Sequence, residues 1–224
     1  LAVDRRDADR EGAAVAIARR ALARERRVEV LHVLGVELGR EAVGPDMAIM
    51  IDINQGWTAD VAINQGRKIV DYDIYWLEEP VPADDFKGYM RVADALPIRI
   101  VGGETHFTRF DLRPFFENPR CPILQPDPMR GGYTELRKIA AAAEPWGIRI
   151  APHLFHETMV HLLASIPNAN YLEYMTWNDD LWIEPVLPGA NGTMSPPERP
   201  GHGLAFRPEI LKDYKVGGSR MTAG

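Results

Sequence analysis

Residues 47–53 read MAIMIDI, a short apolar run that carries one aspartate, Asp52, near its carboxyl end. Five similar runs follow, and each ends on a polar side chain: IYWLE at 74–78, IRIVGGE at 98–104, PILQPD at 122–127, IRIAPH at 148–153 and NYLE at 170–173. Near-continuous apolar runs of this length are typical of strands buried on both faces of a parallel sheet. We therefore expect six strands at these positions.

Segments of helical character separate the runs, and most are bounded by proline or glycine. They cover residues 58–71, 86–96, 108–118, 133–146 and 157–165. An earlier segment, 28–43, repeats apolar residues at helical spacing until Gly44-Pro45-Asp46 stops the pattern. Alternating strands and helices predict an α/β fold in which helices cover a parallel sheet.

The polar residues that close the runs recur at nearly regular intervals of 26, 26, 23, 26 and 20 residues. Such a repeat is one strand plus one helix of a (β/α) barrel, in which the carboxyl ends of the strands converge on one mouth. Any single acid there could be a helix N-cap or a solvated loop residue, but the common phase of all six indicates a site. The six residues are Asp52, Glu78, Glu104, Asp127, His153 and Glu173.

Five carboxylates gathered at one mouth predict a bound cation. Their mutual repulsion in a partly apolar setting is costly unless a positive charge neutralises it. An all-oxygen donor set favours a hard ion, magnesium before calcium or manganese.

The composition excludes several classes of partner. The chain has 224 residues and a formal net charge of −6, which argues against a nucleic acid or an anionic membrane as the main partner and favours small molecules and metals. Its one cysteine, Cys121, excludes an internal disulfide framework, so we expect a reducing, cytoplasmic location. No apolar run approaches about 18 residues and no signal-peptide pattern is visible, so neither a membrane span nor export is expected.

Residues from about 41 to 216 resemble the C-terminal barrel domain of the enolase superfamily, mandelate racemase subgroup. The resemblance is carried by IDINQGW at 51–57, WLEEP at 76–80, GE at 103–104, QPD at 125–127 with GG at 131–132, and PHLF at 152–155. Each motif is weak by itself, but their order and spacing together are specific. The resemblance implies an incomplete TIM-type barrel in which the third to eighth strands are recognisable.

The resemblance also implies roles for the strand-end residues. Magnesium would be held by Asp52, Glu78 and Glu104. His153 and Asp127 would form a catalytic dyad, and Glu173 would lie near the substrate carboxylate.

Three further residues are candidates for substrate contact. Asn54 lies two residues beyond Asp52 and would point to the same side of an extended strand, although a turn role is equally open. His106 and His156 flank the expected mouth, and the alternative for both is an ordinary structural histidine.

The implied chemistry is abstraction of the proton α to a carboxylate, which gives an enediolate. His153 suits proton transfer because the ordinary pKa of histidine lies near working pH, and Asp127 would orient its ring. We expect a magnesium-dependent dehydratase that acts on a sugar acid. Two alternatives stay open, a racemase or epimerase of the same superfamily and a catalytically silent remnant that keeps the metal site.

The amino-terminal part departs from the family pattern. Members carry an α+β capping domain and a Lys-x-Lys base motif on the second strand, but residues 1–45 contain no lysine and residues 1–27 hold eight arginines. We expect an N-terminally truncated barrel without a capping domain, with residues 1–40 as an arm of uncertain homology, 41–216 as the barrel domain and 217–224 as a disordered tail. Alternatively, residues 1–43 supply substitute structure. A homo-oligomer is expected for the full-length form.

Overall fold

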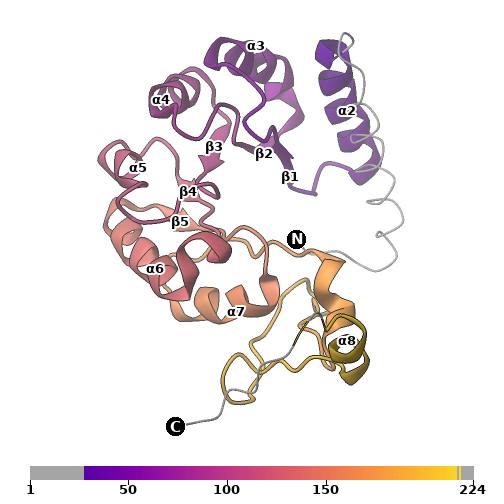
Figure 1. Ribbon diagram of the computed structural model, residues 1–224. Coiled ribbons are helices and arrows are strands. Elements are labelled where there is room, and N and C mark those ends of the chain that lie inside the picture. The colour runs from indigo at the N-terminus through magenta and orange to yellow at the C-terminus, as the bar shows by residue number, and fades with distance from the viewer. Residues whose placement is uncertain (1–27, 216, 218–224) are drawn as a thin grey trace.

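The sheet consists of five parallel strands in sequence order (Figure 1). The computed structural model describes residues 28–215 and 217; the expected arm at 1–27 and the expected tail, apart from residue 217, lie outside these residues. Each strand pairs in parallel with the next one along the chain, as in a (β/α) barrel. The strands are β1 (Ile49–Asp52), β2 (Ile74–Glu78), β3 (Arg99–Gly102), β4 (Ile123–Leu124) and β5 (Arg149–Ile150).

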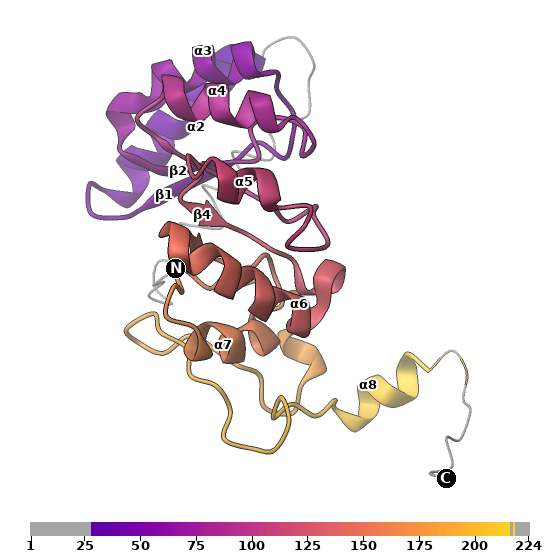
Figure 2. The same cartoon turned by 90° about the vertical axis from the view of Figure 1, so that its left-hand side faces the viewer.

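Helices lie along the outer side of the arc that the strands form, and α2 lies beside β1 (Figure 1). Figure 2 shows α8 apart from this layer, beyond α7. None of the described helices is long and apolar enough to cross a membrane. The α-helices are α2 (Val28–Val43), α3 (Ala59–Ile69), α4 (Phe86–Ala95), α5 (Arg113–Glu117), α6 (Pro128–Ala143), α7 (His156–Ser165) and α8 (Pro208–Asp213), and the 3-10 helices are η1 (Val70–Tyr72), η2 (Glu144–Trp146) and η3 (Thr176–Leu181).

Both faces of the sheet are buried, as the apolar runs predict. Alternate strand residues such as Leu77 and Ile100 join helix residues in the main core, and their neighbours Trp76 and Val101 join a smaller cluster on the other face. Tyr171, beyond β5, closes that second cluster, because its ring centroid lies 5.3 Å from that of Tyr75 and 6.0 Å from that of Trp76. This second face therefore carries a small apolar cluster in which three aromatic rings pack with aliphatic side chains of the strands.

The expected sixth strand at 170–173 does not form. Its pairing with β5 is limited to one bridge between Ile150 and Ala169, extended by a hydrogen bond of 2.8 Å from the Asn170 amide to the Ile150 carbonyl. No described strand pairs with the other edge of this segment, and a ladder with a single short neighbour gains too little to continue.

The helix expected at 108–118 is also shorter than its pattern suggests, because α5 covers only Arg113–Glu117. The Asp111 carboxylate accepts hydrogen bonds from the Phe107 and Thr108 amides and from the Thr108 hydroxyl. This side-chain turn competes with helical backbone pairing and delays the helix until Pro114 fixes its first turn.

Candidate active site at the carboxyl ends of the strands

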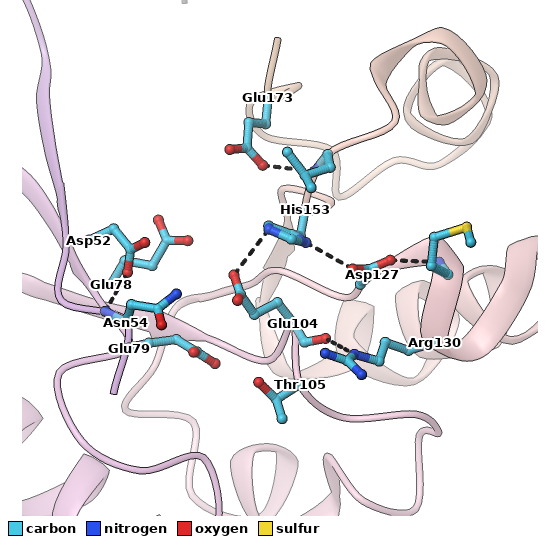
Figure 3. A network of polar contacts seen from close by, with 12 residues as sticks. Asp52, Asn54, Glu78, Glu79, Glu104, Thr105, Asp127, Arg130, His153 and Glu173 are labelled. Carbon is cyan, nitrogen blue, oxygen red and sulfur yellow. Dashed lines mark hydrogen bonds and ion pairs between the residues drawn. The ribbon is translucent and has the colours of Figure 1, made fainter. Parts of the chain in front are cut away.

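Three carboxylates follow three neighbouring strands (Figure 3). Asp52 ends β1 and Glu78 ends β2, and the two residues are direct partners in the parallel ladder. Glu104 comes two residues after β3, beyond Gly102 and Gly103. Because Gly103 has φ of 122°, a conformation that favours glycine, the chain can turn there and bring Glu104 to the mouth.

Burial disfavours the ionised forms of all three acids, and repulsion between carboxylates adds to this at Glu78 and Glu104. Burial raises the pKa of Glu78 to about 8, the charges of Asp52, Glu173 and Glu104 add to the rise, and a hydrogen bond from Gln125 opposes it. Burial likewise raises the pKa of Glu104, although nearby His153 lowers it. Removal from water also raises the pKa of Asp52, although this residue is more exposed than the other two. A hydrogen bond of 2.7 Å from the Asn54 backbone N–H lowers the pKa and so opposes the rise.

The donor chemistry of this group fits a hard divalent cation. Asp52, Glu78 and Glu104 offer only oxygen atoms, and no Lys or Arg side chain forms an ion pair with any of them among the described residues. As the side chains stand, however, no three acids, histidines or cysteines within residues 28–215 lie close enough together to hold an ion. Binding would therefore require the carboxylates to rotate toward one another, and the positive charge of the cation would offset the repulsion between them.

His153 lies opposite the three acids and contacts two carboxylates, those of Asp127 and Glu104 (Figure 3). Its Nδ1 is 2.9 Å from Asp127 Oδ2, and its Nε2 is 3.5 Å from Glu104 Oε2. A carboxylate at Nδ1 favours the tautomer with the proton on that nitrogen, which leaves Nε2 on the side of the mouth. Asp127 Oδ1 also accepts from the Met129 amide at 2.6 Å and caps α6, so this one side chain is both an N-cap and the partner of the histidine.

Glu173 is fixed although its segment forms no strand. Its Oε2 accepts a hydrogen bond of 2.7 Å from the Leu154 amide, and the side chain is exposed at the mouth (Figure 3). Leu154 and Phe155 both have positive φ, 55° and 51°, and form the turn that separates His153 from α7. The turn therefore places the Leu154 amide beside Glu173.

The structure does not bring the other two histidines to the mouth. The His106 ring packs between Phe86 and Phe115, and its burial lowers its pKa. His156 is only 2% exposed, and its ring nitrogens face Glu157 and Asp179, each at 3.5 Å. Both follow sharp turns after strand ends, so proximity in sequence does not predict where their rings point.

Asn54 lies at the mouth (Figure 3), but not by the expected route. The strand stops at Asp52, and Asn54 has φ of 48° in a left-handed turn, so the premise of an extended strand was wrong. Its backbone N–H donates a hydrogen bond to Asp52 Oδ1, which fits the turn role.

Two partners of Glu78 were not singled out from the sequence. Trp76 Nε1 donates to Glu78 Oε2 at 3.0 Å, and Gln125 donates to the same carboxylate. The available signal was the alternation of strand residues, because Trp76 shares a sheet face with Glu78.

A parallel α/β sheet whose strands carry acids and a histidine–aspartate pair at their carboxyl ends is the arrangement of a (β/α) barrel with its polar residues gathered at one mouth. The sequence model of the family described as "Enolase C-terminal domain-like" matches residues 31–210, and the chain belongs to that family.

Relatives with three different reaction names resemble the chain. It is 34% identical to 3,6-anhydro-alpha-L-galactonate cycloisomerase of Streptomyces coelicolor, over 80% of this chain and 50% of the relative. A racemase from Streptomyces coelicolor A3(2), crystallised with bound magnesium, superposes with a TM-score of 0.80 at 32% identity, over 92% of this chain and 58% of that one. L-Talarate dehydratase from Polaromonas sp. JS666, complexed with magnesium and L-glucarate, superposes with a TM-score of 0.77 at 30% identity, over 82% of this chain and 52% of that one. The chain spans about half the length of the curated relatives it matches.

Proposed function

We propose that this chain carries the magnesium site and the histidine of a lyase that removes water from a sugar acid. The observation that carries the proposal is the pairing of His153 with Asp127 at 2.9 Å on the same mouth as Asp52, Glu78 and Glu104. Support comes from the dehydratase crystallised with magnesium and L-glucarate, a sugar diacid.

Asp52, Glu78 and Glu104 would hold the ion in this proposal. Bound magnesium supplies a Lewis acid that stabilises the negative charge developing on the substrate carboxylate. Trp76 and Gln125 orient the Glu78 carboxylate through their hydrogen bonds, and the Asn54 amide orients Asp52.

His153 moves the protons. Asp127 accepts a hydrogen bond from Nδ1–H and so keeps the proton on Nδ1, which leaves the Nε2 lone pair free to remove the proton α to the substrate carboxylate. The C–H electrons form the enediolate, and they return to expel the β-hydroxyl, which leaves as water when the histidine gives it the proton. The enol tautomerises to a 2-keto-3-deoxy acid. Glu173, fixed by the Leu154 amide, presents its other oxygen to the substrate.

A library of aldonic and aldaric acids tests this function. Purified chain and magnesium are incubated with each acid, and the 2-keto product is detected with a carbonyl-specific reagent. We expect product from at least one acid and none when EDTA is present. Absence of product from every acid, with magnesium bound, would support the silent remnant instead.

The second candidate is a racemase or epimerase, favoured by the racemase that superposes on the chain. In D₂O such an enzyme would place deuterium at the α-carbon of recovered acid without forming a keto product. Proton NMR of the same reactions separates the two candidates.

The raised pKa of Glu78 predicts how the metal-free chain responds to pH. Because the pKa is about 8 in the folded state and about 4.5 unfolded, the folded state keeps a proton that the unfolded state releases. The contribution of Glu78 to the free energy of unfolding is therefore fully present below about pH 4.5 and is lost as pH rises through 8. The total loss is several kcal/mol, since each pKa unit corresponds to about 1.4 kcal/mol. Urea unfolding at pH 5.5, 7 and 8.5 measures the fall.

Two controls accompany this measurement. Glu78→Gln, which cannot ionise, should make the fall between pH 5.5 and 8.5 shallower and leave the part due to Glu104, whose pKa is raised to about 7. Saturating magnesium should reverse it, since the cation stabilises the ionised carboxylates. A metal-free chain that gained stability over this range would contradict the burial of Glu78.

A further inference from the structure

One amide side chain, that of Gln55, joins three loops at the mouth. Its Nε2 donates to Glu79 Oε2 at 2.8 Å and to Thr105 Oγ1 at 3.0 Å, and its Oε1 accepts from the Ala83 amide at 3.0 Å. The backbone N–H of Gln55 also donates to the backbone carbonyl of Glu79 at 2.7 Å. Both ends of the side chain and the backbone are therefore engaged with segments that lie 24 to 50 residues away in sequence.

Each joined residue lies close in sequence to a proposed magnesium ligand. Gln55 is three residues after Asp52, Glu79 directly follows Glu78, and Thr105 directly follows Glu104. The three strands are neighbours in the sheet, but their ladders end at or before these ligands. Beyond the ladders, the hydrogen bonds of Gln55 tie the three ligand-bearing loops directly together.

The joined backbone is in conformations that need support. Gln55 and Glu79 have φ of 63° and 37°, in the left-handed region that non-glycine residues rarely adopt. Such residues persist when the surrounding contacts over-determine them, and they gather at functional sites. Glu79 is fully buried, and one of its oxygens, Oε1, has no hydrogen-bond partner. The bond from Gln55 to Oε2 is therefore the main side-chain interaction that satisfies this acid.

We infer that Gln55 is a positioning residue that holds the Asp52, Glu78 and Glu104 loops in the arrangement from which the three carboxylates close on magnesium. Gln55, Glu79 and Thr105 form what we term the clamp. The inference rests on the proposed function for the identity of the ion, but the joining of the loops does not depend on it. The clamp acts through the ligands and touches neither ion nor substrate.

Calorimetric titration of the full 224-residue chain with magnesium tests the clamp. Gln55→Met keeps the length of the side chain and removes its hydrogen bonds, and we expect magnesium affinity to fall by about 10- to 100-fold. The matched control is Asn168→Leu, which removes an amide that donates to the Ala140 and Ile148 carbonyls at the opposite ends of the strands. This control should lower the melting temperature without changing affinity.

A rescue separates positioning from simple destabilisation. The reciprocal variant Gln55→Glu with Glu79→Gln exchanges donor and acceptor, and we expect it to recover most of the affinity that Gln55→Met loses. Thr105→Val, which removes one bond, serves if Gln55→Met fails to fold, and it should lower affinity measurably. Wild-type affinity in Gln55→Met, or in Thr105→Val where that replaces it, would overturn the inference.

Hydrogen exchange without magnesium tests the clamp independently of the ion. The backbone N–H groups of Gln55, Ala83 and His106 report on the three loops. Gln55→Met, or Thr105→Val in its place, should speed the exchange of all three together by about tenfold. Asn168→Leu should leave their exchange rates unchanged. Unchanged exchange would overturn the clamp. If the three amides respond together but the wild-type chain binds no magnesium, the clamp stands and the proposed function is contradicted.

Discussion

Replacement of His153 by alanine is expected to lower kcat by about a thousandfold and leave magnesium affinity within about twofold. The ring is the only imidazole that the described structure places at the mouth, where its Nε2 lies 3.5 Å from Glu104 and its Nδ1 is paired with Asp127. Without it, no other described histidine lies where it could take the α-proton. The measurement is steady-state turnover of the acid sugar found in the library, beside magnesium titration of the same preparation.

Asp127→Asn is the matched variant. An asparagine oxygen can still accept from the Met129 amide and cap α6, so the helix should remain. Its amide group, however, would donate to Nδ1 and force the proton onto Nε2, which removes the base. We expect a loss of kcat that approaches that of His153→Ala. More than about a tenth of wild-type turnover in either variant would contradict the role of the pair.

The order of elements was predictable because alternating apolar runs and helices leave few α/β arrangements. The five strands that formed lie within their predicted runs. Asp52 and Glu78 are the last residues of their strands, whereas Asp127 and His153 lie three residues beyond theirs. Asp127 shows that a helix cap and a partner of the histidine are not exclusive alternatives, because one oxygen caps α6 and the other contacts His153.

The rest depended on contacts that a linear pattern does not contain. The run at 170–173 has the composition of a strand, but strand formation needs continued pairing with a neighbour, and the described pairing with β5 stops at the bridge of Ala169 and the hydrogen bond of the Asn170 amide. His106 and His156 follow turns whose direction is set by packing against Phe115 and Asp179. Gln55 was not singled out from the sequence, because its hydrogen bonds reach loops that lie up to 50 residues away.

Glu104→Gln is expected to lower magnesium affinity by at least about 100-fold and to abolish turnover. The carboxylate is one of three proposed ligands, and a neutral amide oxygen offers the cation far less attraction at a partly buried site. Buried glutamate without a cation is costly to ionise, so the metal-free variant should melt at the same temperature as wild type or above it at pH 8. The variant thereby separates loss of the site from loss of the fold.

Thermal unfolding with and without magnesium measures both effects in one experiment. Wild type should gain about 2.7 kcal/mol at magnesium concentrations near 100 times the dissociation constant, and Glu104→Gln should gain almost nothing. Asp60→Asn is the control, because it removes the same single negative charge from α3, where Asp60 forms an exposed ion pair with Arg91 of α4, and it should keep the full gain. A magnesium-dependent gain in Glu104→Gln equal to that of wild type would exclude this carboxylate as a ligand. Loss of the gain in both variants would mean that net charge, and not the three strand-end acids, attracts the ion.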